Sequence, residues 1–427
     1  MQARDIAAQM RLPECFHEPL QKDYPCYSVS IATDVGSRKH QEDRCTFAHG
    51  LSPADSDSAF FGIFDGTVGD FASENVKDLV VPHLLGGRSW VEVEKLVGRP
   101  QEGSGEALVQ ALAQAMREMY LNSDRELVEM CKKEAKHYAS STSVTVMCAF
   151  GYLVIGHLGD SRAALGFERH GTLAGEFLTV DHKPDAPEER RRIVTSGGSV
   201  EYLHNHNNKP FIRGGDFTMR KQAGEQPMQL QYSRAFGGKD LKMFGLSCEP
   251  DVSIVQASDN HKVLILASDG LWDVYDALTA VSIAWRAMET GDSPAEALVR
   301  SAVDFQKSRQ ANADNITAIV AFFRHGARGA AQDGRQSAPA SSSDAPPQGT
   351  PGATAADGDA QVPASPAEEN PSRSPAAPGT SPAPAPAGGG GGGEGTATES
   401  PSEVKEGSAG GTGEGEGVDG KAGETKT

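Results

Sequence analysis

The sequence predicts an α+β domain of antiparallel sheets covered by helices, followed by a disordered tail. Two observations predict the domain: short β-rich stretches occur as neighbours along the chain, and helical stretches are grouped between them. A third observation predicts the tail: residues 327–427 contain no Trp, Tyr, Phe or Ile and are rich in Gly, Ala, Pro, Ser and Thr. Such a segment cannot bury enough apolar surface to offset its chain entropy.

The apolar patterns place the elements within residues 25–325, after an N-terminal extension of residues 1–24. Strands are expected at 26–34, 44–50, 59–65, twice within 143–160, and at 252–257, 262–268 and 316–323. Helices are expected near 70–81, 105–137, 186–196, 275–288 and 293–307. Residues 201–230 have no clear period, so we expect this region to be rich in loops.

The composition of the chain limits the kinds of partner that we expect it to bind. The formal net charge of −18 disfavours a phosphate-backbone ligand, so no nucleic acid partner is expected. Six cysteines without CxxC spacing are typical of reduced thiols in a cytoplasmic or nuclear protein. The first residues lack a signal-peptide core, and no apolar run is long enough to span a bilayer. We therefore expect a monomer without a membrane anchor.

Acidic residues recur beside the predicted strands. Asp65 and Asp269 each end a strand and precede a glycine, and Asp314 and the pair Glu42–Asp43 lie just before strands. Asp160 lies in HLGDSR, at the end of the strand pair of 143–160. One such aspartate is usually a turn or cap residue, but several could converge at a sheet edge. Carboxylates gathered that closely repel one another unless a cation neutralises them, and oxygen ligands suit Mg²⁺ or Mn²⁺.

The same stretches carry a resemblance to a known family. The matching motifs, in order, are GSRKHQEDR (36–44), FFGIFDG (60–66), SSTSVTV (140–146), GHLGDSRAAL (156–165), LTVDHKPDAPEERRRI (178–193), SGGSV (196–200), YSRAFGG (232–238), ASDGLWDV (267–274) and ADNIT (313–317). Together they resemble the metal-dependent protein phosphatases of the 2C family. The resemblance implies an α/β/β/α sandwich of two antiparallel sheets that hydrolyses phosphoserine or phosphothreonine in phosphoprotein substrates.

The resemblance also implies roles for residues of the site. Two Mn²⁺ or Mg²⁺ ions per subunit would be held by Asp65, which bridges them, and by the Gly66 carbonyl, Asp269 and Asp314. Asp160 and Asp269 match the positions of a third, weaker metal site. Glu42 and Asp43 match the family's acidic pair beside the metals, and Arg38 matches its phosphate-binding arginine, whose fork can grip two phosphate oxygens.

The chain departs from the family in the stretch DGTVG, where the family usually reads DGHGG. Thr67 therefore replaces a histidine that is commonly assigned as the general acid, and a positioned acid typically contributes about 10²–10⁴-fold in rate. Val68 replaces a glycine, which should mainly affect loop shape. If residues 38–42 are extended, His40 would face the same way as Arg38 and could stand in for the missing acid; otherwise it is an ordinary solvent-facing residue.

Two further departures concern the surroundings of the site. Gly238 stands where the family usually has an aspartate, so metal preference could shift. The region 201–230 resembles the family's flap but is long and basic, so it could select acidic or phosphorylated substrates or be a plain solvated loop. Its basic residues are Lys209, Arg213, Arg220 and Lys221. His204 and His206 in this region could bind a metal, but a surface loop is the simpler reading.

Three readings of function stay open at this stage. The first is an active Ser/Thr phosphatase, the second a weakly active or inactive binding or scaffold protein, and the third a phosphatase of small molecules. The charged residues of 188–192 are expected to form a solvated helix face, Trp272 a core residue, and His157 a satisfied strand residue. The tail contains Ser/Thr-Pro sites for proline-directed kinases or is simply flexible; they are Thr350, Ser365, Ser374, Ser381 and Ser400.

Overall fold

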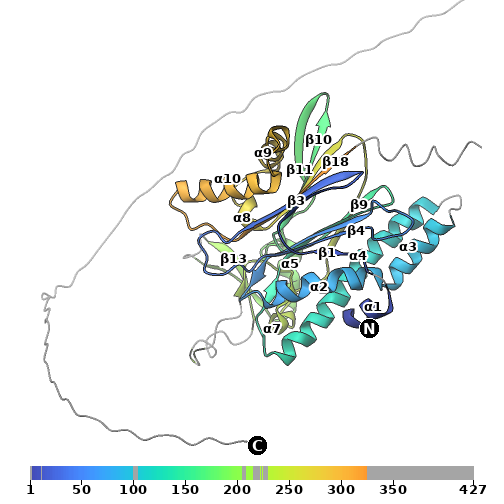
Figure 1. Cartoon of the computed structure of the whole chain (residues 1–427). Helices are drawn as coiled ribbons and strands as arrows, with labels where there is room; N and C mark the ends of the chain where they lie inside the picture. Colours follow the sequence, from blue (N-terminus) through green and yellow to red (C-terminus); the bar gives the residue numbers. More distant parts are fainter. Residues whose placement is uncertain are drawn as a thin grey trace, which may run out of the picture. The chain divides into compact units, whose positions relative to one another are not determined.

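Two six-stranded antiparallel sheets form the centre of the computed structural model, and helices lie on both sides of them (Figure 1). The structure describes residues 2–10, 12–99, 104–203, 208–214, 222, 224 and 229–324. The tail from 327 onward, His204, His206, Arg220 and Lys221 lie outside this description. The α+β class is confirmed.

The first sheet has the strand order β1-β4-β5-β8-β9-β16. Its strands are β1 (Cys15–Phe16), β4 (Arg44–His49), β5 (Ala59–Phe64), β8 (Ser143–Ala149), β9 (Tyr152–Leu158) and β16 (Asp251–Gln256). The second sheet has the order β11-β10-β17-β18-β3-β2. Its strands are β2 (Leu20–Asp23), β3 (Tyr27–Asp34), β10 (Arg162–Arg169), β11 (Thr172–Phe177), β17 (His261–Ala267) and β18 (Ile316–Phe323).

The helices divide between the outer faces of the two sheets. Figure 1 shows α2, α3 and α4 on one side of the strands and α9 and α10 on the other. The helix bounds are α1 (Ala3–Gln9), α2 (Phe71–Leu85), α3 (Arg88–Gly98), α4 (Ser104–Lys133), α5 (Pro187–Thr195), α7 (Lys239–Lys242), α8 (Asp269–Trp272), α9 (Ala277–Thr290) and α10 (Pro294–Ser308).

Alternation along β5 explains how one strand serves two apolar layers. Phe60 and Phe64 pack in the cluster beneath α2 and α4, whereas Phe61 and Ile63 pack in the cluster between the sheets. Successive side chains of a strand point to opposite faces, so a continuous apolar run is what a strand buried on both faces requires. A third cluster joins the second sheet to α9 and α10. The result is the α/β/β/α layering implied by the resemblance.

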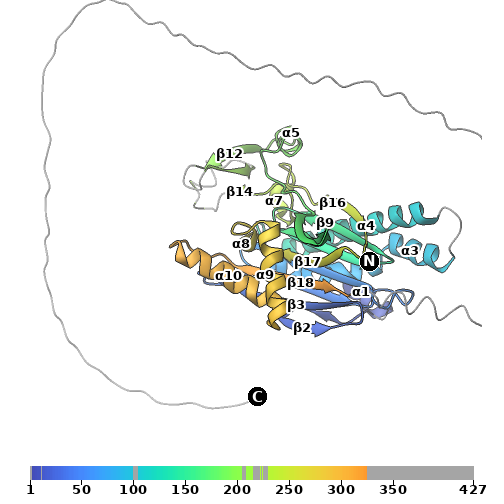
Figure 2. The same cartoon turned by 90° about the horizontal axis from the view of Figure 1, so that it is seen from above.

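Several elements differ from the sequence prediction. The hairpin β10–β11 and the helix α3 were not predicted, and the region 201–230 contains more than loops. It contributes to a small antiparallel sheet of β12 (Ser199–Leu203), β13 (Lys209–Arg213) and β14 (Gln229–Leu230), which lies beside α5 (Figure 2). Another small sheet joins β6 (Gly66–Thr67), β7 (Ser140–Ser141) and β15 (Phe236–Gly237).

Residues ahead of the predicted domain contribute one strand to each large sheet. Strand β1 pairs with β4 in the first sheet, and β2 pairs with β3 in the second. These residues therefore belong structurally with the domain. Four of the six cysteines, Cys26, Cys45, Cys131 and Cys148, are buried. Among the helices that the structure describes, none has the length and apolar character needed to cross a membrane.

Candidate active site

A cleft of about 350 Å³ lies where carboxylates of both large sheets meet. Strand β5 ends and β4 begins at this edge of the first sheet, and β17 ends and β18 begins at the same edge of the second. The lining residues are Arg38, Glu42, Asp65, Gly66, Thr67, Val68, Asp160, Phe211, Gln229, Leu230, Gln231, Tyr232, Asp269, Asp314 and Asn315. The structure therefore brings together five of the six predicted acidic residues, and Asp43 lies directly behind them.

The backbone around Asp65 is held tightly. The Thr142 amide donates to the Asp65 carbonyl at 2.9 Å. A Cβ atom on Gly66 would lie 2.6 Å from the Glu42 carbonyl oxygen and 2.7 Å from Ser73 Oγ, closer than real Cβ atoms approach other atoms. Glycine is thus required for the close approach of these two segments, whatever the carbonyl of Gly66 binds.

Asp43 is buried behind the cleft. The Ser268 hydroxyl donates to Asp43 Oδ2 at 2.7 Å, which joins the segment before β4 to the end of β17. Burial raises the pKa of Asp43 to about 6, although hydrogen bonds from Ser268 and Thr317 oppose the rise. Hydrogen bonds therefore hold the Asp43 carboxyl group in place although burial of its charged form is unfavourable.

Burial also raises the pKa values of Asp65 and Asp269 well above their usual range. Neighbouring carboxylates add to the rise in pKa by repulsion. Asp43 and Asp269 repel the charge of Asp65, and Asp160 and Asp273 repel that of Asp269. A group of buried carboxylates that repel one another is destabilising unless a cation or a proton neutralises it. The donor set of carboxylate oxygens fits a hard divalent cation such as Mg²⁺ or Mn²⁺.

Arg38 lies at the cleft and forms an ion pair with Asp314, with Nη2 2.6 Å from Oδ2. The Arg38 side chain is 58% exposed, so its guanidinium can still reach a ligand in the cleft. The loop that carries it is fastened by Asn315, whose side-chain amide donates to the Val35 and His40 carbonyls at 3.0 and 3.1 Å. Asn315 Oδ1 also accepts from the Glu42 amide at 2.8 Å.

On the other side of the cleft, Asp160 is paired with Lys183. The Lys183 Nζ atom lies 2.5 Å from Asp160 Oδ2 and 3.6 Å from Asp181 Oδ2. Burial opposes the charge of this lysine, but Asp160 and Asp181 raise its pKa overall. Lys183 was not singled out from the sequence, although it follows Asp181 in the quoted motif. It provides a fixed positive charge beside the predicted third metal position.

Thr67 lies on β6 at the wall of the cleft. The Tyr232 hydroxyl donates to Thr67 Oγ1 at 2.8 Å and lies 3.0 Å from Ser140 Oγ. The next residue, Val68, has φ of 64° and is 57% exposed. This left-handed conformation is unusual for a β-branched residue, so Val68 strains the loop at the cleft wall.

The other predicted substrate contacts are placed less directly. Residues 38–40 form a bend rather than an extended strand, and His40 is exposed and absent from the cleft lining. The condition for His40 to replace the missing acid is therefore not met. Arg213 hydrogen-bonds Gln229 at 2.9 and 3.1 Å and pairs with Glu201 inside the small sheet, and Lys209 lies 3.5 Å from Asp273. Gly238 lies outside the lining, with Leu246 nearest to its missing Cβ.

The prediction of a solvated face at 188–192 is wrong for Glu189 and Arg192. Glu189 is buried on α5 and pairs with Arg192 and with Arg234, both at 2.7 Å. Trp272 is buried as predicted, and its indole N–H donates to the Ala267 carbonyl at 2.9 Å. His157 is likewise satisfied, because its Nε2 atom lies 2.8 Å from the Val180 carbonyl oxygen.

A second possible metal group combines His157, His182 and Asp251, whose ligand atoms lie within 4.8 Å of one another. The Gly159 amide donates to His182 Nδ1 at 3.1 Å, so the neutral ring carries its proton on Nε2. That nitrogen faces Asp251 Oδ2 at 3.2 Å and has no lone pair for a cation. The two imidazole rings are also stacked, 4.4 Å apart. This group is therefore better explained as a histidine–carboxylate pair than as a metal centre.

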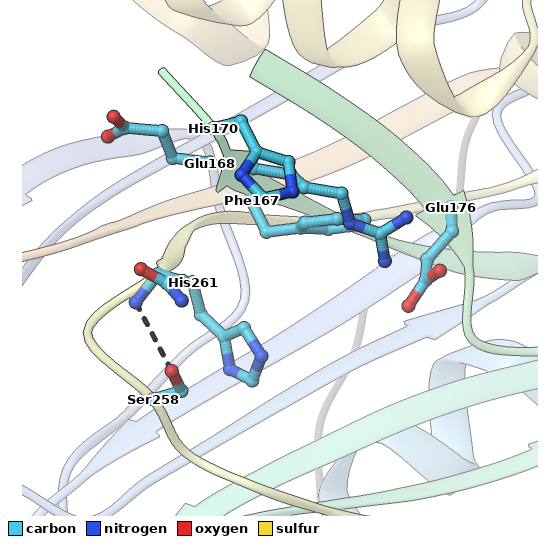
Figure 3. A pocket seen from close by; sticks show the side chains of 8 residues that line it. Phe167, Glu168, His170, Glu176, Ser258 and His261 are labelled. Atoms are coloured by element: carbon cyan, nitrogen blue, oxygen red, sulfur yellow. Dashed lines mark hydrogen bonds between the residues drawn. The ribbon is translucent and has the colours of Figure 1, made fainter. Parts of the chain in front are cut away.

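Another hollow, of about 470 Å³, lies at the opposite end of β10 and β17 (Figure 3). Arg162 pairs with Ala267 near the carboxylate cleft, whereas Phe167 pairs with His261 at this hollow. Figure 3 shows its acidic side chains, Glu168 and Glu176, on opposite sides rather than gathered. The hollow therefore has no arrangement of ligands comparable to that of the cleft.

Comparison with known proteins identifies a family whose members match this chain across the cleft. The family model described as Protein phosphatase 2C matches residues 28–315. The chain belongs to the protein phosphatase 2C family. The match covers both large sheets from β3 almost to the start of β18, and so includes every acidic residue of the cleft.

Individual members of the protein phosphatase 2C family and solved structures agree with this assignment. "Probable protein phosphatase 2C 2" of Arabidopsis thaliana is 31% identical over 302 residues, covering 69% of this chain and 67% of that relative. A crystal structure of a serine-threonine phosphatase 2C from Toxoplasma gondii is 58% identical, with a TM-score of 0.72, and covers 73% of this chain and 100% of that one. A C. elegans sex determining protein shares the fold at 20% identity and a TM-score of 0.52.

Proposed function

We propose that this chain is a metal-dependent protein serine/threonine phosphatase that hydrolyses phosphoserine and phosphothreonine in phosphoproteins. The observation that carries the proposal is the group of partly buried carboxylates at the cleft, with the Arg38 guanidinium beside it. The similarity to a solved serine-threonine phosphatase 2C supports the same activity. Cytoplasmic or nuclear location and a monomeric state remain expectations from composition.

The residues present fit two Mn²⁺ or Mg²⁺ ions per subunit. Asp65, the Gly66 carbonyl, Asp269 and Asp314 would hold them, with Glu42 and Asp43 beside them. Asp160 and Asp269 would contribute to a third, weaker site. Such cations would supply a water activated for attack on phosphorus and would offset the charge of the carboxylates. Because burial raises the pKa of Asp65 and Asp269, cation binding should displace protons from the cluster.

Arg38 would bind the phosphate group. A guanidinium offers two parallel N–H donors to phosphate oxygens and stabilises charge that develops on them in the transition state. Its ion pair with Asp314 holds it at the cleft, and its 58% exposure leaves donors for the substrate. Asn315 supports this geometry by fixing the loop from Val35 to Glu42.

Departure of the serine or threonine oxygen is the step at which this chain differs from the family's usual pattern. Threonine is not an acid near neutral pH, so Thr67 cannot replace a histidine as a proton donor. Slow turnover is therefore expected with leaving groups that depart as strongly basic alkoxides. The alternative function, a phosphatase-fold binding or scaffold protein, rests on this same substitution.

The deciding experiment is turnover of a phosphothreonine peptide by the full chain with Mn²⁺, with Mg²⁺ and with a chelator. Asp269→Asn is the site variant, and Asp304→Asn on the exposed side of α10 is the matched control. We expect metal-dependent turnover that Asp269→Asn reduces by about 10²-fold or more and Asp304→Asn leaves unchanged. Absence of metal-dependent turnover in the wild type would favour the binding or scaffold alternative.

A further inference from the structure

The inference concerns three hydroxyl groups that form a chain ending in the cleft: Ser140, Tyr232 and Thr67. It rests on the proposed phosphatase function and addresses what replaces the missing histidine. Ser140 is fully buried and Tyr232 is 5% exposed, while Thr67 is partly exposed at the cleft wall. The three residues come from β7, from the segment after β14 and from β6.

The direction of the hydrogen bonds is fixed by counting protons. The Tyr232 hydroxyl donates its one proton to Thr67 Oγ1 at 2.8 Å. The contact of 3.0 Å between Ser140 Oγ and Tyr232 is then donated by Ser140. Since Thr67 Oγ1 accepts from Tyr232, its own O–H proton must point elsewhere, and the cleft is the open direction.

Tyr232 keeps its proton under all ordinary conditions. Burial raises the pKa of its phenol well above the usual range. The hydrogen bonds with Ser140 and Thr67 lower this pKa, but by less than burial raises it. The phenol is therefore a poor proton donor in the acid–base sense but a permanent hydrogen-bond donor to Thr67. A buried, unionised donor of this kind fixes the orientation of the group that it contacts.

We propose that Tyr232 is a positioning residue that fixes the Thr67 hydroxyl, and that Thr67 donates a hydrogen bond to the departing oxygen of the substrate. In this step a water oxygen forms a bond to phosphorus, and the bond from phosphorus to the serine or threonine oxygen breaks. The departing oxygen leaves with the bonding electron pair, and the hydrogen bond from Thr67 stabilises its charge. The proton lost by the attacking water, delivered through solvent, then neutralises it.

A purely structural role would be to fasten β6 to the segment after β14. The two roles differ in how the effect depends on the leaving group. A hydrogen bond to the departing oxygen matters when that oxygen becomes a basic alkoxide, as from phosphothreonine. It matters little for p-nitrophenyl phosphate, because nitrophenolate is a stable anion. A structural defect would slow both substrates alike.

The test compares Tyr232→Phe and Thr67→Val with the wild type on both substrates, in the full chain with Mn²⁺. For the phosphothreonine peptide we expect kcat to fall about 10²-fold in Thr67→Val and about tenfold in Tyr232→Phe. For p-nitrophenyl phosphate we expect changes below about threefold. Adding Tyr232→Phe to Thr67→Val should cost nothing further, because Tyr232 acts through Thr67.

Tyr275→Phe is the matched control, since the hydroxyl of Tyr275 hydrogen-bonds Ser301 on α10 and neither residue lines the cleft. It should leave both rates unchanged. Equal losses on the two substrates, or no loss on the peptide, would overturn the inference while an active wild type upholds the phosphatase function. A wild type inactive on both substrates would overturn the proposed function itself and the inference with it.

Discussion

Glu189 and Arg234, 45 residues apart in the chain, form a buried ion pair in which Arg234 Nη2 lies 2.7 Å from Glu189 Oε1. Arg192 and Ser233 donate to the same carboxylate. Burial alone would raise the pKa of Glu189, but the hydrogen bonds from Arg192, Arg234 and Ser233 lower it to about 2. The pair ties α5, beside the small sheet of β12, β13 and β14, to the segment that carries Tyr232.

Glu189→Gln should lower the free energy of unfolding by about 3 kcal/mol, because it leaves two arginines without their buried anion. The neighbouring Glu188 is exposed and pairs with the exposed Arg191, so Glu188→Gln should change stability by less than about 0.5 kcal/mol. Urea denaturation at pH 7 measures both. The wild-type contribution of Glu189 should disappear as the pH falls below 4.5 towards 2. Equal effects of the two variants would contradict this account.

Val68→Gly should stabilise the protein by about 1 kcal/mol. The left-handed conformation of Val68 costs a β-branched residue more than the extra chain entropy costs a glycine, and its side chain is largely exposed. Thermal unfolding measures the change. Val180→Gly is the control, because Val180 is also exposed but lacks a positive φ, and it should lose about 0.5 kcal/mol. A destabilising Val68→Gly would show that this loop is not strained.

Asp43→Asn should stabilise the metal-free protein at high pH and weaken its metal binding. The pKa of Asp43 is raised from 3.8 to about 6, so the folded state loses stability as the pH rises through this window. Asparagine mimics the protonated acid, which gives a gain on the order of 3 kcal/mol at pH 8 that shrinks to about 0.5 kcal/mol at pH 4. Denaturation in chelator at the two pH values measures it, and a gain that does not depend on pH would refute it.

Asn315→Ala should lower the free energy of unfolding by about 2 kcal/mol, since two carbonyls and one amide lose their partner. Because the loop that carries Arg38 is then released, KM for the phosphopeptide should rise as well. Asn260→Ala, at an exposed loop position, should change neither quantity appreciably. Loss of stability without a change in KM would show that Asn315 does not position Arg38.

The sequence was most informative where one strand meets one carboxylate. The run that ends in Asp65 predicted β5, because burial on both faces demands apolar residues, and the recurrence of such acids beside other strands predicted the site at its end. The hairpin β10–β11 was missed because its outer strand is only half-buried and contains Gly175 and Glu176, which weaken the pattern. Helix α3 was missed although Trp90, Val93 and Val97 recur at helical spacing and pack in the first apolar cluster.

The remaining features depend on contacts between distant parts of the chain. Tyr232 and Thr67 are 165 residues apart, and no local pattern relates them. Glu189 lies in a charged stretch that is typical of a surface helix. Its burial is possible because it forms an ion pair with Arg234, which is distant in the sequence. Strands β12 and β13 contain only five residues each, too few for a clear alternation, and their pairing with each other stabilises them.

The strands β1 and β2 limit the tendency of this protein to self-associate. Each lies at the edge of a large sheet, where it covers the backbone amides and carbonyls of β4 and of β3. An uncovered edge is a template on which a strand of another molecule can add. A chain that began at Tyr24 would present two such templates at once, and we expect it to self-associate in light scattering even if its cleft were intact.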